Sequence, residues 1–199
     1  MSARSFVIVG QTALASDAFL LNDFPGTSGR LDVLARCVRA ALLVSHGVRR
    51  DAAVYLVLLG GPRAPRTVRI AGADVKFLRP DERSIATLLQ KVLTGDHGAA
   101  GDGFVPVKPG IAVAAGGLDA VLADLTTESL YVLDETGSDA RGHLRSAGGA
   151  FFLGDHVGFN PDARAQLLSL GARTVSVGPV SLHTDDVVSV VSNELDRIA

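Results

Sequence analysis

Short apolar runs that end at glycine alternate with segments of helical period along most of this chain, and this alternation limits the folds open to it. Phe6–Val9, Ala53–Leu59 and Phe151–Leu153 are such runs, and glycine follows each of them directly. Continuous apolar runs are typical of strands buried on both faces, and the helices between them then cover the sheet. The sequence predicts one α/β domain of 199 residues, with a mostly parallel sheet and helices on both faces.

Local signals predict where individual elements begin and end. A helical period runs from Ser28 to Ser45, with Ser28 expected as its N-cap and Gly47 as its C-terminal stop. The other local expectations are a hairpin of Thr67–Ile70 with Val75–Leu78, a helix from Pro80 to about Leu93, and a surface loop over Gly95–Pro109 that is the best internal boundary.

Charge is divided unevenly along the chain, although the total is only -2. Residues 1–100 carry 13 Lys or Arg against 8 Asp or Glu, whereas residues 101–199 carry 6 against 13. Such asymmetry indicates a face that binds a polyanion, and two differently solvated surfaces would give the same pattern. Sixteen of the 19 basic residues are arginine, whose forked guanidinium favours phosphate contacts.

The basic residues gather around the helix predicted after Ser28. Asp32 and Arg36 are four residues apart, so an ordinary surface ion pair would explain them if they stood alone. They do not stand alone, because Arg30 precedes them and more basic residues flank the same helix. These are His46, Arg49 and Arg50, with Arg79 and Arg83 in the charged corner RPDER. A carboxylate inside an arginine cluster either orients the guanidinium groups or does acid–base work, and both roles fit a negatively charged substrate.

Three strand ends in the second half carry small or polar residues suited to a ligand pocket: Leu133-Asp134, Gly154-Asp155-His156 and Val177-Gly178-Pro179. In open α/β sheets, ligands bind outside the carboxyl ends of the strands. The dinucleotide pattern GxGxxG and the phosphate-loop pattern GxxxxGK[ST] do not follow any of the predicted strands. The pocket is therefore expected to take some other small molecule.

Two polar groups invite a metal-site interpretation that their spacing disfavours. Asp155 and His156 are adjacent, so in a strand their side chains would point to opposite faces and could not face one metal without a turn, and no metal is expected. Near His183, the hydroxyl of Thr184 is expected to cap the last helix, and the two following aspartates interact with the helix dipole.

The cysteine content and the hydropathy of the chain indicate the cellular compartment in which the protein is expected. Cys37 is the only cysteine, so no disulfide within the chain is possible, and we expect it to pack in a helix. No stretch approaches the 18 or more apolar residues of a membrane span, and the N-terminal apolar run is too short for a signal peptide. We expect a cytoplasmic protein with no membrane partner.

Five blocks of the sequence together resemble a known family. They are PGTSGRLDVLARCVRAALLVSHGVRRD, AVYLVLLGG, RPDER, FLGDHVGF and SVGPVSL, and they span about Phe24 to Leu195 in the same order. They resemble the TrmY family of the SPOUT superfamily, whose members are pseudouridine-N1 RNA methyltransferases. The resemblance implies a C-terminal trefoil knot, a homodimer, and S-adenosylmethionine as the methyl donor with no metal. The expected substrate is RNA, specifically pseudouridine 54 in the tRNA T-arm, and not DNA.

The resemblance also assigns residues to roles. The N-terminal half, about 1–94, is expected to face RNA, and the knotted half, about 110–199, to hold the donor. Asp32 is expected to accept the N1 proton or to hold the base for its loss to water. Arg30 and Arg36 are expected to orient the base or to neutralise negative charge that develops on its ring carbonyl groups. Phosphate contacts are expected at Arg49, Arg50, Arg79 and Arg83. Donor contacts are expected at Leu133, Gly154, Val177, Gly178, Pro179, Val180, Ser181, Leu182 and Val187.

Two positions depart from the pattern of the archaeal members that act on tRNA. Where those proteins have histidine followed by cysteine, this chain has Asp186 and Val187. Two alternatives therefore stay open: a SPOUT methyltransferase acting on a ribosomal RNA pseudouridine or a ribose 2′-oxygen, and an RNA-binding dimer that has lost catalysis.

Overall fold

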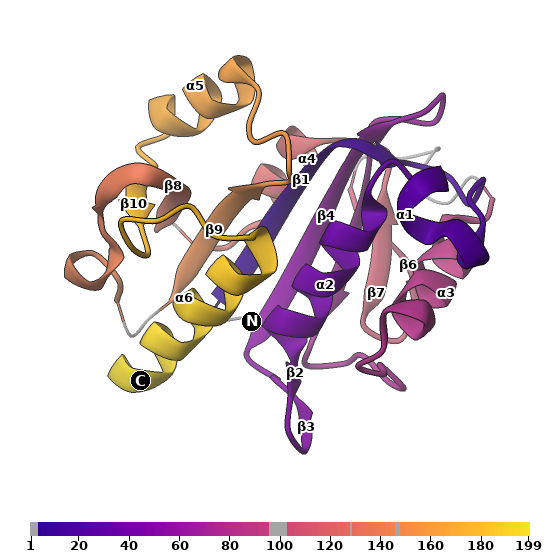
Figure 1. Cartoon of the computed structure of the whole chain (residues 1–199), viewed down its shortest axis with the longest axis horizontal. Coiled ribbons are helices and arrows are strands. Elements are labelled where there is room, and N and C mark those ends of the chain that lie inside the picture. Colours follow the sequence, from indigo (N-terminus) through magenta and orange to yellow (C-terminus); the bar gives the residue numbers. More distant parts are fainter. Residues whose placement is uncertain (1–3, 96–102, 128, 146–147) are drawn as a thin grey trace.

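One eight-stranded sheet runs through the molecule in the order β10-β8-β9-β1-β4-β5-β7-β6 (Figure 1). The structure is a computed structural model, and it describes residues 4–95, 103–127, 129–145 and 148–199. The strands of the sheet are β1 (Arg4–Leu14), β4 (Ala52–Gly60), β5 (Arg66–Ala71), β6 (Val105–Lys108), β7 (Ile111–Ala114), β8 (Leu130–Asp139), β9 (Gly149–Gly154) and β10 (Arg173–Ser176). A separate hairpin consists of β2 (Leu43–Val44) and β3 (Gly47–Val48).

The half of the sheet that contains the three predicted strand ends consists of parallel strands. From β10 to β4 every neighbouring pair is parallel, whereas β5, β7 and β6 continue the sheet in antiparallel pairs. The first seven residues of both β1 and β4 are buried, which explains their nearly unbroken apolar sequence. The prediction of a mostly parallel sheet is confirmed, and its antiparallel end lies in the region around the predicted internal boundary.

Helices cover both faces of the sheet, as predicted (Figure 1). They are α1 (Phe24–Thr27), α2 (Leu31–Leu42), α3 (Glu82–Leu93), α4 (Leu118–Asp124), α5 (Pro161–Ser169) and α6 (Thr184–Ile198), with short 3-10 turns η1 (Leu21–Asp23) and η2 (Ala140–Gly142). Side chains of α2, α3 and α6 share one core with Phe6 and Ile8 of β1. Side chains of α4 and α5 share the opposite core with Val7 and Val9, because successive strand residues point to opposite faces.

The ends predicted for α2 are wrong, although the helix itself exists. It begins at Leu31, because Gly29 and Arg30 have φ angles of 65° and 68°, in the left-handed region that an α-helix cannot include. Only glycine fits before Arg30, since a Cβ on Gly29 would lie 1.9 Å from the carbonyl oxygen of Thr12. Ser28 closes α1 instead, and its hydroxyl accepts a hydrogen bond from the Leu31 N–H at 3.1 Å. The helix ends at Leu42, where the chain enters the β2–β3 hairpin.

Two other segments differ from the sequence-based expectation. Val75–Leu78 is not a strand, because Phe77 has a φ angle of 59° that interrupts extended backbone. The predicted loop Gly95–Pro109 contains β6, which pairs with β7 at the edge of the sheet. Pro106 is tolerated there because an edge strand can leave one side unpaired. Residues 96–102 of the same predicted loop lie outside the described residues.

Two further predictions concern membrane-spanning helices and the position of Cys37. Across the described ranges, no helix combines the length and the hydropathy needed to cross a bilayer. Cys37 is fully buried in α2, and this burial raises the pKa of its thiol. The prediction that Cys37 packs in a helix is confirmed.

We predict that Phe151→Ala lowers the free energy of unfolding by about 3–5 kcal/mol, because Phe151 has no exposed surface and packs between two aromatic rings. Its ring centroid lies 5.5 Å from that of Phe6 and 5.1 Å from that of Tyr131. The same change at Phe77, which is 97% exposed, serves as the control and should alter stability by less than about 0.5 kcal/mol. Urea denaturation measures both, and equal losses would contradict this account of the core.

Candidate functional site

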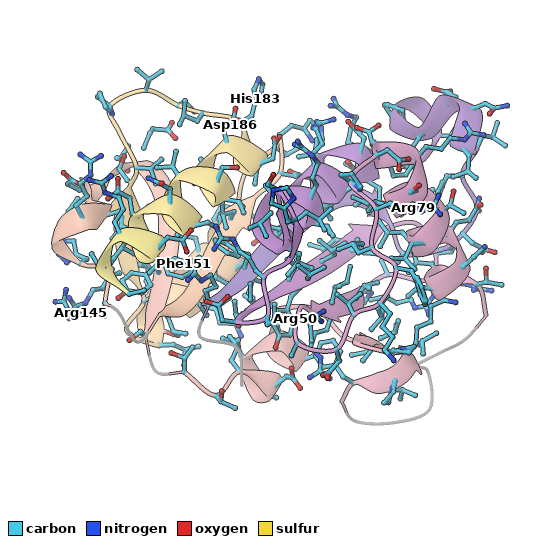
Figure 2. All side chains as sticks on the ribbon, turned by 90° about the horizontal axis from the view of Figure 1, so that it is seen from below. Arg50, Arg79, Arg145, Phe151, His183 and Asp186 are labelled. Atoms are coloured by element: carbon cyan, nitrogen blue, oxygen red, sulfur yellow. The ribbon has the colours of Figure 1, made fainter. Side chains whose placement is uncertain are left out.

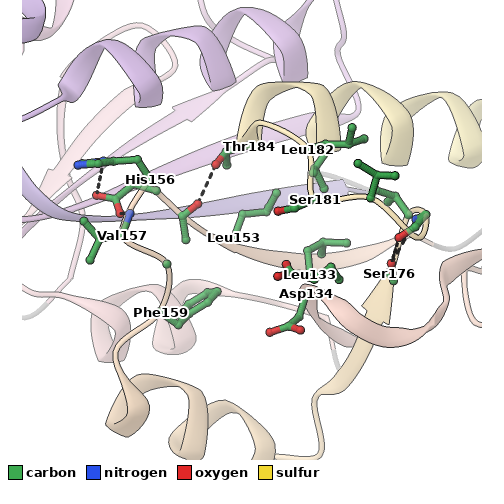
Figure 3. A pocket seen from close by; sticks show the side chains of 18 of the residues that line it. Leu133, Asp134, Leu153, His156, Val157, Phe159, Ser176, Ser181, Leu182 and Thr184 are labelled. Carbon is green, nitrogen blue, oxygen red and sulfur yellow. Dashed lines mark hydrogen bonds and ion pairs between the residues drawn. The ribbon is translucent and has the colours of Figure 1, made fainter.

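A cavity of about 400 Å³ lies at the carboxyl ends of β9 and β10 and beside the middle of β8 (Figure 3). Its apolar wall includes Leu133, Leu153, Val177 and Val187, and polar side chains such as Asp134, Asp155 and His156 also line it. The cavity lies where the strand-end rule places a ligand site in a parallel sheet. Its volume falls within the range of about 300–1,000 Å³ that is common for cofactor sites.

An irregular stretch of β8 forms one wall of this cavity. β10 pairs with β8 at Tyr131 and Val132, and the register then jumps so that pairing resumes only at Ser138 and Asp139. The residues between, 133–137, leave the regular ladder, and Leu133, Asp134 and Glu135 line the cavity. A break in a ladder re-aims side chains in this way.

The segment that follows β10 forms the opposite wall and leads into α6. The Ser176 hydroxyl donates to the Gly178 carbonyl at 2.6 Å and accepts from the Gly178 N–H at 3.2 Å, which fixes the turn (Figure 3). Thr184 does not cap α6 with its side chain, so that prediction is wrong. Its hydroxyl donates to the Gly154 carbonyl at 2.9 Å instead, joining α6 to the end of β9.

All but one of the predicted donor contacts line this single cavity. Pro179 is the exception, since it lines a neighbouring cavity of about 400 Å³ that shares Val177 and Gly178 with the first. Of the two positions that depart from the family pattern, Val187 contributes to the cavity wall, whereas Asp186 is exposed and does not line it.

Carboxylates dominate the charge of the cavity lining. Asp134, Glu135 and Asp155 line it, with Arg164 as the single arginine or lysine. Arg164 forms an ion pair with Asp134. A hydrogen bond from Thr136 is the largest influence on Asp134, and together with Arg164 it holds the pKa of that carboxyl below its ordinary value. The lining as a whole is suited to a cationic ligand.

Asp155 and His156 both line the cavity, because a turn follows the strand, the one case that the strand-based expectation left open. The strand ends at Gly154, and a turn closed by a bridge between Asp155 and Gly158 follows it. The turn brings His156 Nδ1 to 3.8 Å from Asp155 Oδ2 (Figure 3). The glycine at 158, with its φ angle of 84°, was the sequence signal for this turn.

The predicted cluster at the start of α2 is a set of short, direct contacts. The Asp32 side chain is only 2% exposed, and Arg30 binds it with two hydrogen bonds of 3.0 and 3.2 Å. Arg36 adds a third bond at 3.0 Å. Burial alone would raise the pKa of Asp32, but the two guanidinium groups outweigh burial and hold that pKa below its ordinary value.

The irregular end of β1 connects this cluster to the cavity. Pairing of β1 with β4 breaks between Gly10 and Leu14. Within the break, the Gln11 N–H donates to Asp155 at 2.8 Å, and the Thr12 hydroxyl donates to the Gly29 carbonyl at 2.9 Å. Arg30 directly follows Gly29. The segment Gln11–Thr12 therefore contacts Asp155 on the cavity wall and also Gly29, the residue next to the arginine cluster.

A second connection runs through α6. Arg36 Nη1 lies 3.3 Å from Glu82 at the start of α3, and its Nε lies 3.9 Å from Asp185 in the first turn of α6. Asp185 follows Thr184, which lines the cavity. The structure therefore brings the predicted catalytic residues next to the predicted donor pocket within one chain.

The four arginines expected to contact phosphate are not gathered at the cavity. Arg49 binds Asp196 with bonds of 2.5 and 2.7 Å, in a network with Arg4 at the amino end of β1. Arg50 donates to the carbonyl groups of residues 72 and 73, both at 3.0 Å. Figure 2 shows Arg50 and Arg79 well apart from Asp186 at the start of α6.

Arg79 and Arg83 lie close to the start of α3. Arg83 donates to the Leu21 carbonyl and the Asn22 side chain near α1. Arg79 is exposed, and its side chain has no hydrogen bond or ion pair with any other described residue. An external anion could therefore bind Arg79 without displacing a hydrogen bond or ion pair to another described residue.

Residues 3–199 match the family described as "Putative SAM-dependent RNA methyltransferase". The chain belongs to this family. It is 42% identical over 195 residues to the tRNA (pseudouridine(54)-N(1))-methyltransferase of Methanosarcina acetivorans, covering 98% of this chain and 91% of that protein. The enzyme of the same name from Methanosarcina mazei is 43% identical over the same length and coverage.

A solved structure shows the same fold at low sequence identity. The crystal structure of Archaeoglobus fulgidus Nep1 bound to S-adenosylhomocysteine superposes with a TM-score of 0.64 at 15% identity, over 100% of this chain and 99% of that chain. The two chains therefore share one fold.

The cavity of this methyltransferase fits S-adenosylmethionine in size and in charge. The sulfonium and ammonium groups of that molecule are cationic, and the lining holds more carboxylates than cationic groups. The apolar wall offers a surface for the adenine ring. Within the described ranges, no group of His, Cys, Asp and Glu is arranged to hold a metal ion.

We predict that Asp32→Asn lowers the free energy of unfolding by about 1–3 kcal/mol at pH 7, since it removes a buried charge bonded to two arginines. The folded-state pKa of Asp32 lies below the ordinary value of 3.8, so the stabilisation is present above about pH 4. It is lost as the pH falls through the folded-state pKa, and the two proteins should then converge.

Urea denaturation between pH 7 and pH 2 measures this difference. Asp74→Asn, a change at an exposed loop carboxylate, is the control and should have little effect at any pH. A loss at Asp32 that does not change with pH would contradict the ionic origin of the stabilisation.

Proposed function

We propose that this protein transfers the methyl group of S-adenosylmethionine to N1 of pseudouridine 54 in the T-arm of tRNA. The observation that carries the proposal is the position of the Arg30–Asp32–Arg36 cluster next to a carboxylate-lined cavity of cofactor size. Relatives from three archaea that are 38–43% identical over 98% of this chain have this activity in their names, which supports the choice of substrate.

The donor supplies a methyl group that is already activated on a positively charged sulfur. The chain therefore has to bind the donor, orient it and exclude competing nucleophiles, and positioning alone can supply much of the rate enhancement. We propose that Leu133, Gly154 and Val187 contact the donor together with the segment Val177–Leu182. Pro179 would shape this segment from the side of the neighbouring cavity.

The arginine cluster is proposed to hold the target base. Arg30 and Arg36 would face the ring carbonyl groups, where negative charge develops when N1 loses its proton. Asp32 accepts three hydrogen bonds from these two residues, and its lowered pKa makes it a weak proton acceptor. Of its two expected roles, the geometry favours the role of holding both guanidinium groups in place.

We propose that the N-terminal half, residues 1–94, faces RNA, and that residues 110–199 hold the donor. Arg79 and Arg83 are the phosphate contacts that the surface position supports best. Arg49 and Arg50 are proposed to contact phosphate as well, and each would have to exchange an internal acceptor for it. The T-arm nucleotide is folded inward in tRNA, so it has to be splayed out of its stack to reach the cavity.

Assembly and threading are part of the same proposal. We propose a homodimer in which the basic half of one subunit faces the donor pocket of its partner. Arg30 and Arg36 belong to that basic half, but they are proposed to act at the cavity of their own chain. Val157, Val180 and Leu182 are exposed apolar side chains on the cavity lining, and a second copy would cover them. We also propose that the C-terminal half forms a trefoil knot and that the enzyme meets its tRNA in the cytoplasm.

We expect the purified protein with S-adenosylmethionine to methylate a T-arm RNA that carries pseudouridine at position 54. The matched RNA with uridine at that position should not react, because uridine has its glycosidic bond at N1. Mass spectrometry of the nucleosides measures the product. Methylation of ribosomal RNA or of a ribose instead would replace this substrate assignment, and donor binding without any methyl transfer would favour an RNA-binding protein.

We predict that Arg79→Ala weakens RNA binding and reduces the slope of log K against log salt by about 0.7–0.9, the value for one lost phosphate contact. Arg173→Ala is the control, because this exposed arginine starts β10, at the end of that strand remote from the cavity. Fluorescence anisotropy at several salt concentrations gives both slopes. An unchanged slope for Arg79→Ala would remove that residue from the RNA face.

A further inference from the structure

The proposed reaction releases the N1 proton, and the described site contains an imidazole with no other assigned role. We propose that His156, oriented by Asp155, accepts this proton from the target pseudouridine. The inference rests on the proposed function and extends it to the acid–base step.

Asp155 is built to hold a partner in one orientation. Its side chain is completely buried, and its two oxygens accept backbone N–H groups of Gln11 and Val157, both at 2.8 Å. His156 Nδ1 lies 3.8 Å from the same carboxylate. Hydrogen bonds in catalytic groups are often long before substrate binds. With Nδ1 towards Asp155, the other ring nitrogen, Nε2, is left as the proton acceptor.

The imidazole lies between the two parts of the site. His156 lines the cavity, and Figure 3 shows its ring on the side of the cavity remote from Leu133 and Leu182. Its side chain is 39% exposed, so a base entering from outside could reach it. Gln11 contacts Asp155, and the adjacent Thr12 contacts Gly29, so His156 lies across one short segment from the Arg30 cluster. The pKa of Arg30 is raised chiefly by its hydrogen bond to Asp32, and the charge of Asp155 adds a smaller contribution.

Three other candidates near the cavity are less suited to this step. Asp32 and Asp134 are both bound to arginine, and both have lowered pKa values. His183 precedes α6, does not line the cavity and makes no side-chain hydrogen bond within the described part of the chain. His156 is the imidazole that combines an orienting carboxylate with access to the cavity.

The step balances in atoms and charge. The N1–H bond breaks, its proton goes to Nε2 of neutral His156, and the N1 electron pair forms the new bond to the methyl carbon. The carbon–sulfur bond breaks with its electron pair kept by sulfur, so the positive charge passes from the sulfonium to the imidazolium. Water then takes the proton from His156 and restores the neutral ring.

A first experiment separates chemistry from binding. His156→Gln should lower the single-turnover rate on pseudouridine T-arm RNA about 100-fold, the lower range for loss of a general base. Calorimetry should show unchanged affinity for S-adenosylmethionine and for the RNA. Added imidazole should restore part of the rate of His156→Ala, which a structural role would not allow. His183→Gln is the matched control, and its rate should stay at the wild-type value.

A second experiment does not depend on methyl transfer by the protein. Nuclear magnetic resonance of ¹³C-histidine protein, with His156 identified from the His156→Gln spectrum, reports whether the ring meets N1. RNA with pseudouridine should shift the His156 signals, whereas the same RNA already methylated at N1 has no proton to share and should shift them less.

Different outcomes of these experiments test the assignment of His156 and the proposed function. Equal shifts with both RNAs, or a wild-type rate for His156→Gln, would overturn the assignment of His156. If the wild-type protein does not methylate pseudouridine, the proposed function fails, and the resonance comparison still decides whether His156 contacts N1.

Discussion

Parallel pairing of β1 with both β4 and β9 is the constraint on which the rest of this structure depends. β1 is buried on both faces, so its backbone groups have to be paired within the sheet. The register places Arg4 of β1 beside Ala52 of β4 and Gly149 of β9, so the carboxyl ends of the three strands lie at the same end of the sheet. Every residue proposed to act on the donor or the target base lies at this end of the sheet or beside it.

The site forms where two strands of the sheet, β8 and β1, leave regular pairing. β8 departs from β10 after Val132 and supplies one cavity wall, and β1 departs from β4 after Gly10 and contacts both Asp155 and Gly29. The rigid sheet fixes where each departure begins, and the irregular backbone then aims side chains that a regular strand would direct elsewhere. Packing of α2 against α6 brings Arg36 to Asp185 across the same region.

The sequence contained enough information to locate the cavity but not its detailed chemistry. Apolar runs ending at glycine correctly indicated the strands, and the strand-end rule selected Leu133, Gly154 and Val177, which the fold brings around one cavity. Periodicity assumes regular backbone, so it failed where the left-handed residues Gly29 and Arg30 delay the start of α2. After Gly154 the strand has ended, and a turn that periodicity does not locate places two adjacent side chains together. The trefoil knot and the dimer came from family resemblance, because no local pattern encodes threading or assembly.

The charge asymmetry between the halves has a structural component that composition does not reveal. Arg49 and Arg4 of the basic half bind Asp196 of the acidic half, and Arg36 lies near Asp185. These contacts join residues nearly 150 or more positions apart, so opposite charge helps to hold the two halves together. An arginine engaged in such a pair has to give up its partner before it can bind phosphate, whereas an exposed arginine without one does not. The polyanion face should therefore be sought among arginines such as Arg79 rather than in the overall excess of positive charge.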